Sequence, residues 1–359
     1  MESELADLPP ATLPPNTLLS LMNFPDDPEQ TKKFSDELSA WLIELSRFYD
    51  LERLAGVTVG YDFDAALKSV DRGFESTTDA AEYTNNDDIV CVAKVVNVLR
   101  DGRPMAHVVY NAGMIEQITD PEHHHHNTAI NILAHELGHV VELKWRDEAM
   151  PGVMLKYRPP ALVDHFLLQM ATACWEEYAA CRLSAPFGNP DELLTNYASS
   201  FNQAVKKSLT EAQEAIKLFR THADVNKLLV EAGQPLAMPF KLAGYLLGHM
   251  DGVESEAKPL TLCPDLGGSL YGPLIPGVWI ALRKLWDTTE TWDGSISIFD
   301  DLTKVAHACF ASAGIDLQKQ ADDLYYAHVP FTAATMPNGE ADMVMIRLQE
   351  NLRGLLRNR

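Results

Sequence analysis

Hydrophobic positions in the first third of the chain alternate with polar ones, as they do in half-buried strands. Apolar residues at positions 57, 59, 61 and 63 predict one strand. Two further apolar runs, residues 89–99 and 105–111, flank Asp101 and Gly102, which are residue types that tolerate the positive φ angles of a tight turn. This part of the chain is therefore predicted to form a small sheet that includes a β-hairpin.

Most of the remaining chain has the three- and four-residue spacing of apolar positions that is typical of helices. Asn127, Asn189 and Asp224 stand where N-caps are needed, and Pro159-Pro160 opens a long apolar stretch. A helix of about four turns is expected from Asn127. Further helices are expected at residues 31–54, 161–184, 190–219, 224 onward, 239–249, 276–286, 299–313 and 341–356, with a glycine- and proline-rich loop at 262–277. The predicted fold class is α+β.

Composition narrows the class of protein. The chain has 359 residues and 46% hydrophobic content, which supports an extensive core. Its 29 basic and 51 acidic residues give a net charge of −22, which argues against a nucleic-acid or membrane partner. The first residues lack the pattern of a signal peptide and no apolar run is long enough to span a bilayer, so we expect a cytoplasmic protein. The five cysteines are widely spaced and are expected to be buried thiols.

Three regions are expected along the chain. Residues 1–30 contain six prolines, a composition that favours an extended tail over packed structure. Residues 31–188 hold the predicted sheet and the residues that carry chemistry, and are expected to form a catalytic region. Residues 189–359 are expected to form a helical region that supplies the other wall of a cleft.

The residues with the clearest chemical meaning are His135, Glu136, Leu137, Gly138 and His139. Two imidazoles four residues apart lie on one face of a helix and can bind one metal ion. Glu136 projects beside them, where it can accept a proton from a metal-bound water. Gly138 costs about 1 kcal/mol relative to alanine in a helix, so we expect that a neighbouring backbone or a substrate needs the space. The pattern predicts a hydrolytic metal centre.

This motif resembles the active-site helix of the zincin metallopeptidases, in which it occurs as His-Glu-Leu-Gly-His. The resemblance covers the motif helix and a later helix that contains glutamates. One zincin branch continues with Gly-x-x-His or Gly-x-x-Asp, and residues 140–145 (Val-Val-Glu-Leu-Lys-Trp) offer neither. The resemblance therefore implies a gluzincin-like arrangement, with a zincin-like fold, one zinc ion per chain and a third ligand from the later helix.

Glu176 and Glu177 are the two candidates for the third ligand. Glu176, followed by Ala179, matches the Glu-x-x-Ala pattern of gluzincins, and the resemblance makes it the preferred metal ligand. Glu177 is the alternative, although its helical face is more apolar and makes a charge there harder to explain. That face contains Phe166, Met170, Cys174 and Cys181.

The residues around the predicted metal centre follow less directly from the sequence than the ligands do. If Glu176 is the ligand, Ala180 stands where an aspartate often orients a ligating histidine, so another residue such as Asp147 or Asp164 must do so. Three residues of the helical half can stabilise an oxyanion, although sequence spacing does not place them near His135: Tyr245, His249 and Tyr271.

Two segments before the motif helix also have a predicted role. Residues 105–112 are a candidate sheet edge for pairing with an extended substrate, with an ordinary internal strand as the alternative. The four consecutive histidines at positions 123–126 precede the helix and are expected to form a solvated loop.

The sequence as a whole predicts a zinc-dependent metallopeptidase with a peptide or protein substrate. His135, His139 and Glu176 would bind zinc, and Glu136 would act as general base. Two alternatives stay open: a regulatory protein with a structural zinc held by four protein ligands, and a metal-dependent hydrolase of a non-peptide bond.

Overall fold

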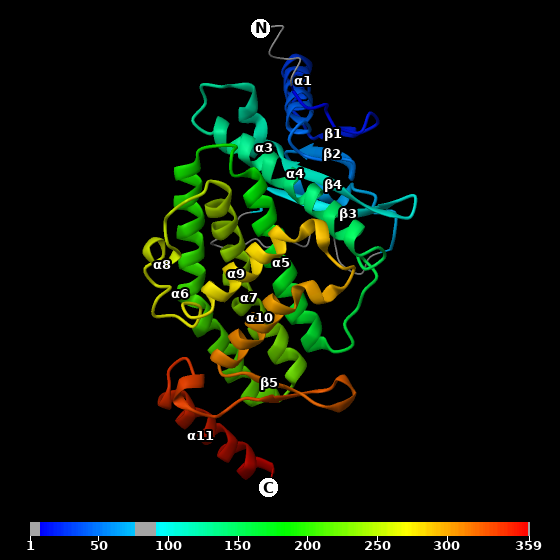
Figure 1. Cartoon of the computed structure of the whole chain (residues 1–359). Coiled ribbons are helices and arrows are strands. Elements are labelled where there is room, and N and C mark those ends of the chain that lie inside the picture. Colours follow the sequence, from blue (N-terminus) through cyan, green and yellow to red (C-terminus); the bar gives the residue numbers. More distant parts are fainter. Residues whose placement is uncertain (1–7, 76–90, 358–359) are drawn as a thin grey trace.

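Four strands in the N-terminal part of the chain form a mixed sheet (Figure 1). The computed structural model describes residues 8–75 and 91–357. The strands are β1 (Leu18–Met22), β2 (Leu54–Gly60), β3 (Ala93–Arg100) and β4 (Arg103–Asn111), in the spatial order β1-β2-β4-β3. β1, β2 and β4 are parallel, and β3 runs antiparallel to β4 at one edge.

The predicted hairpin is confirmed for the described residues. Arg100 pairs with Arg103 across Asp101 and Gly102, whose φ angles are 50° and 78°, as a tight two-residue turn requires. Residues 89 and 90 of the predicted first run lie outside the described part. β4 pairs with β2 on one side and with β3 on the other. The expectation that residues 105–112 form a substrate-binding edge is therefore wrong, and the alternative of an internal strand holds.

Part of the expected N-terminal tail belongs to the sheet. Leu18–Met22 forms β1, which pairs in parallel with β2 from Leu18 opposite Gly56 to Met22 opposite Gly60. The prolines that suggested an extended tail flank this strand and leave its five ladder positions free of proline, so they do not prevent pairing. Residues 1–7 of the expected tail lie outside the described residues.

The N-terminal core lies between the sheet and two helices, α1 (Pro28–Leu45) and α4 (His126–Ala149). Leu133 and Leu137 of α4 are fully buried in the same core as Val57 and Val108 of the sheet. The hydroxyl of Tyr110 also donates a 3.2 Å hydrogen bond to the carbonyl of Leu133. The sheet therefore fixes the position of the helix that carries the motif. The short helix α2 (Phe63–Lys68) packs in a separate small core with residues of β3 and β4.

The rest of the described chain is mainly helical, so the predicted α+β class is confirmed. α5 (Leu162–Ser184), α6 (Pro190–His222) and α7 (Val225–Gly252) form the centre of a second core. α9 (Ile275–Asp287) and α10 (Asp300–Ser312) pack on it, and α11 (Glu340–Arg357) lies at the end of the molecule opposite the sheet (Figure 1). The remaining elements are short: α3 (Ala112–Ile115), α8 (Pro259–Leu262), β5 (Asp316–Lys319), β6 (Tyr325–His328) and 3-10 turns at 116–119, 289–291, 296–299, 321–323 and 333–335.

α7 continues through Pro235 and Pro239, where the sequence predicted two helices. The flanking residues Leu236, Phe240 and Leu242 are buried in the helical core. Their burial outweighs the hydrogen bonds that the two prolines remove.

A row of glycines lets α7 approach α5 closely. Gly244, Gly248 and Gly252 are spaced four apart on one face of α7. A Cβ atom at these positions would lie 2.4 Å from the carbonyl oxygen of Cys174, 2.3 Å from that of Tyr178 and 2.6 Å from that of Arg182. Side chains there would collide with the backbone of α5, which cannot rotate away as a side chain can.

We expect Gly248→Ala to lower the free energy of unfolding by roughly 2–3 kcal/mol, because the added methyl group forces α5 and α7 apart. Gly233→Ala on the same helix is the matched control, since its Cβ meets only side chains at 3.6 Å or more. The control is expected to be neutral or slightly stabilising through helix propensity. Urea denaturation measures both, and equal stabilities of the two variants would contradict the glycine contact.

Candidate metal centre

The motif histidines lie on the face of α4 that is turned toward α5. α4 begins at His126, with His125 in the N-cap position and without a side-chain cap, so the N-cap expected at Asn127 is two positions too late. A Cβ at Gly138 would lie 3.0 Å from the Cα and 3.1 Å from the carbonyl oxygen of Ala180. The expectation that a neighbouring backbone needs this space is confirmed, and that backbone is α5.

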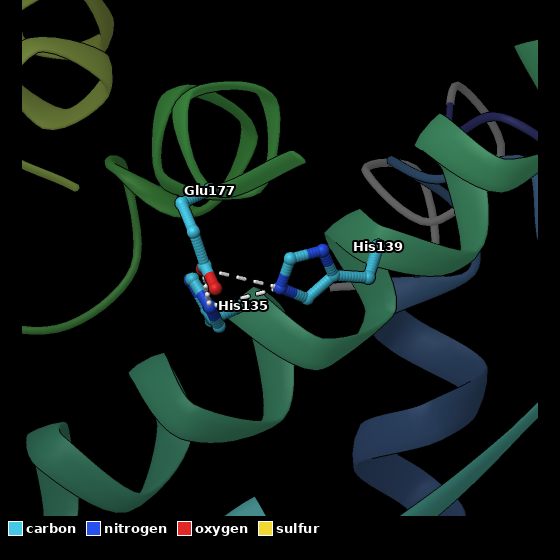
Figure 2. Close-up of side chains that lie close together, drawn as sticks. All are labelled: His135, His139 and Glu177. Atoms are coloured by element: carbon cyan, nitrogen blue, oxygen red, sulfur yellow. Dashed lines mark hydrogen bonds and ion pairs between the residues drawn. The ribbon is translucent and has the colours of Figure 1, made fainter. Parts of the chain in front are cut away.

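His135, His139 and Glu177 converge on one point between α4 and α5 (Figure 2). The two Nε2 atoms are 3.2 Å apart. Glu177 Oε2 lies 3.3 Å from Nε2 of His135 and 3.4 Å from Nε2 of His139. The exposed fraction of the side chain is 9% for His135, 16% for His139 and 9% for Glu177, so the cluster is buried.

The three distances fit a tetrahedral metal site. Bonds of about 2.0–2.1 Å to the corners of a tetrahedron place those corners about 3.3 Å apart. Among the described residues, no donor satisfies Glu177 Oε2 with hydrogen-bond geometry, although a buried carboxylate oxygen needs a partner. A cation at the point of convergence would satisfy this oxygen and both imidazole lone pairs. The cluster can therefore bind a metal ion.

Glu176, the preferred third ligand from the sequence, does not reach this point. Its carboxylate forms a 2.8 Å ion pair with Arg146 near the end of α4, and 35% of its side chain is exposed. Adjacent residues on a helix point about 100° apart, so Glu176 and Glu177 cannot both face the histidines. The preference for Glu176 is wrong, and the alternative, Glu177, occupies the ligand position.

The apolar surroundings of Glu177 were the signal that could have decided between the two glutamates. An acid on the buried face of a helix is costly unless a cation or donors pair with it. Such an acid is therefore the better candidate for a metal ligand. Glu177 is also followed by Ala180, so it matches Glu-x-x-Ala as well as Glu176 does. The sequence pattern alone does not separate them.

A second set of residues supports the ligands. Cys181 Sγ lies 3.5 Å from Nδ1 of His135, where it can accept a hydrogen bond from the Nδ1–H group and leave Nε2 free to bind a metal. The ring of Tyr245 stacks on His135 with centroids 5.3 Å apart and planes at 12°. The ring of Tyr197 packs in turn against Tyr245, with centroids 5.5 Å apart. These contacts fix the orientation of His135.

Cys181, rather than Asp147 or Asp164, takes the place of the orienting aspartate. Asp147 forms a 2.9 Å ion pair with Arg53, and Asp164 accepts a 2.6 Å hydrogen bond from Tyr325. Both suggestions for this role are wrong. A cysteine is easily missed from sequence because its weak acceptor character is rarely used for this purpose.

The residues considered for oxyanion stabilisation also separate in space. Only Tyr245 reaches the centre. Nε2 of His249 pairs with the carbonyl of Pro190 at 2.9 Å, and the hydroxyl of Tyr271 shares a hydrogen bond with Ser208.

Of the four consecutive histidines, His126 is in α4 with its Nδ1 3.0 Å from the carbonyl of Gln117. The other three precede the helix, as expected.

Burial and neighbouring charges shift the pKa values of the two glutamates at the centre in opposite directions. Burial raises the pKa of Glu136, more than the nearby His135 and His139 lower it. Burial acts in the same sense on Glu177, but Lys241 and His139 outweigh it and hold its pKa well below the usual range. Lys241 Nζ lies 3.2 Å from Glu177 Oε1. Glu177 is therefore a carboxylate, which is the form that binds metals.

Comparisons with protein-family models, with curated proteins and with solved structures gave no match. No helix in the described residues is long and apolar enough to cross a membrane.

We expect Glu177→Gln to weaken metal binding by at least tenfold, because it removes the charged ligand, while Glu176→Gln leaves the affinity within about twofold. The two residues are neighbours on one helix, so each variant controls for the other. Competition with a chromogenic chelator measures the affinities. The opposite order would restore Glu176 as the ligand.

Metal binding should also release a proton. Burial opposes protonation of His139, but the carboxylates of Glu177 and Glu136 outweigh it and raise its pKa to about 9. A metal must displace this proton, so its apparent affinity should weaken about tenfold for each pH unit below that value. Calorimetry at pH 7 in two buffers of different ionisation enthalpy counts the released protons. A count of zero would contradict the raised pKa.

Proposed function

We propose that this protein is a zinc-dependent metallopeptidase of the gluzincin type, with His135, His139 and Glu177 as the zinc ligands. The observation that carries the proposal is the convergence of two imidazole nitrogens and one carboxylate oxygen at separations of 3.2–3.4 Å. Two nitrogen ligands and one oxygen ligand in tetrahedral spacing suit zinc. The resemblance of residues 135–139 to the zincin motif supports the same conclusion.

The number of ligands supports a catalytic site over a structural one. Structural zinc sites are closed by four protein ligands, whereas catalytic sites have three and leave a position for water. Within residues 8–75 and 91–357, the cluster contains three metal-binding side chains. Cys181, the nearest sulfur, faces Nδ1 of His135 on the far side of the ring from Nε2.

We assign the proton transfer to Glu136. A bound zinc ion would lower the pKa of a coordinated water to about 7 and polarise the scissile carbonyl. Glu136 is buried and close enough to both histidines for their charges to affect its pKa. Its carboxylate accepts a proton from the attacking water and passes it to the leaving amine. Burial, which raises its pKa, makes it a stronger base for this step.

The substrate is proposed to lie along the free edge of β3. In the described sheet, β4 is the one strand that pairs with β3. On the outer edge of β3 the backbone N–H of Leu99 donates a 2.8 Å hydrogen bond to the carbonyl of Arg72, so the part of this edge nearer Ala93 is the part that can pair with an extended peptide. Cys91, just before β3, lies close enough to the centre for Glu136 and Lys241 to affect its pKa; burial and Glu136 raise this value to about 11. α4, which carries the two histidines, also packs beside β3, and we infer that an extended peptide at β3 would approach the metal from this side. The substrate-binding edge predicted at residues 105–112 is therefore proposed for the neighbouring strand, β3.

Glu136→Gln is the direct test of the mechanism. We expect it to reduce peptide hydrolysis by at least a thousandfold, because the amide cannot accept the proton, while zinc content stays at one per chain. Elemental analysis and cleavage of a proteome-derived peptide library measure the two properties. Glu176→Gln, which changes a glutamate outside the centre in the same way, should retain activity. Equal activity of Glu136→Gln and wild type would rule out this mechanism.

A further inference from the structure

Lys241 lies beside the candidate metal centre, and neither the motif nor the proposed reaction explains its presence there. It lies on α7, and its Nζ is 3.2 Å from Oε1 of Glu177. The other carboxylate oxygen, Oε2, faces the two histidines. The two oxygens of Glu177 are therefore divided between an ammonium group and the position of the metal.

The backbone of α7 is shaped to bring Lys241 to this place. Gly244, one turn further along, allows α7 to approach so closely that a Cβ there would lie 3.2 Å from the Cβ of Glu177. Tyr245, four residues after Lys241, stacks on His135. One face of α7 thus provides two side chains that contact the cluster, Lys241 at Glu177 and Tyr245 at His135.

A lysine beside a metal ligand needs an explanation, because its positive charge opposes binding of a cation. A carboxylate can bind a metal through one oxygen or through both. If both oxygens of Glu177 bound the metal, the second would take space that a water needs. An ammonium group that donates a hydrogen bond to Oε1 prevents this. The ion pair is partly buried, with 32% of the Lys241 side chain and 9% of the Glu177 side chain exposed, so it is weakly screened.

We propose that Lys241 is a positioning residue that holds Glu177 to a single metal-binding oxygen and so preserves the coordination position of the water. This inference rests on the proposed function for the identity of the site. It makes α7, which carries none of the proposed ligands, the helix that sets how many oxygens of Glu177 bind the metal. Lys241 acts through Glu177 and not on the substrate.

Cobalt(II) substitution tests the inference without any substrate, because four-coordinate cobalt absorbs visible light more strongly than five-coordinate cobalt. We expect the wild type to give the intense four-coordinate spectrum. Lys241→Met, which keeps an unbranched side chain one atom shorter and removes the charge, should shift the spectrum to the weaker five-coordinate form. Lys241→Arg should restore the wild-type spectrum, since it returns a cationic donor.

Lys144→Met is the matched control for loss of an ion pair. Lys144 lies on α4, is 13% exposed, and pairs with Asp50 at 2.6 Å and Glu52 at 2.8 Å. Lys144→Met removes a lysine–carboxylate ion pair that lies away from the metal ligands, so the cobalt spectrum should not change. An unchanged spectrum in Lys241→Met, with cobalt bound, would overturn the role of Lys241.

X-ray absorption of the zinc-loaded wild type gives a second test that needs no variant. Four nitrogen and oxygen neighbours, with a single carboxylate oxygen, support the inference, and two carboxylate oxygens overturn it. Failure of the proposed function would look different. A wild type that binds no cobalt or zinc would overturn the metal centre itself. A wild type that binds metal but cleaves no peptide would overturn the proposed reaction alone, and the cobalt spectra would still decide the role of Lys241.

Discussion

The candidate metal centre depends on the close contact between α4 and α5 at Gly138 and Ala180. The imidazoles come from α4 and the carboxylate from α5, so their separation is set by how near the two helix backbones approach. A Cβ at position 138 would lie 3.0 Å from the Cα and 3.1 Å from the carbonyl oxygen of Ala180, so α5 would have to move outward by a few tenths of an ångström. A shift of this size already exceeds the tolerance of about 0.2 Å on a metal–ligand distance. The apparently unfavourable glycine inside the motif therefore has a geometric reason.

The sequence predicted those parts of the structure that depend on local patterns. The hairpin around Asp101 and Gly102, most of the helices and the pairing of His135 with His139 each follow from residues close together in the chain. Strand order was not predictable in this way. Whether β4 is central or at an edge depends on β1 and β2, which lie more than 40 residues earlier, and no local pattern encodes that pairing.

The choice between Glu176 and Glu177 shows where motif matching ends. Both glutamates satisfy the spacing, and the difference between them is which side of α5 faces α4. That orientation is set by tertiary contacts on both sides of the helix: Arg146 of α4 pairs with Glu176, and Lys241 of α7 pairs with Glu177. The buried face of α5 is visible in the sequence. A charge in such apolar surroundings is unfavourable unless a cation pairs with it, and no local pattern shows that α4 brings two histidines to this charge.

The two hydrophobic cores meet at the metal centre. His135 and His139 stand on a helix packed against the sheet, whereas Glu177 stands on a helix packed among α7, α9 and α10. A bound ion would thus add a link between the two cores, beside the backbone contact of Gly138 with Ala180 and the ion pair of Arg146 with Glu176. A shift of the helical core relative to the sheet would separate the three donors, so retention of the ion would depend on the alignment of α4 and α5.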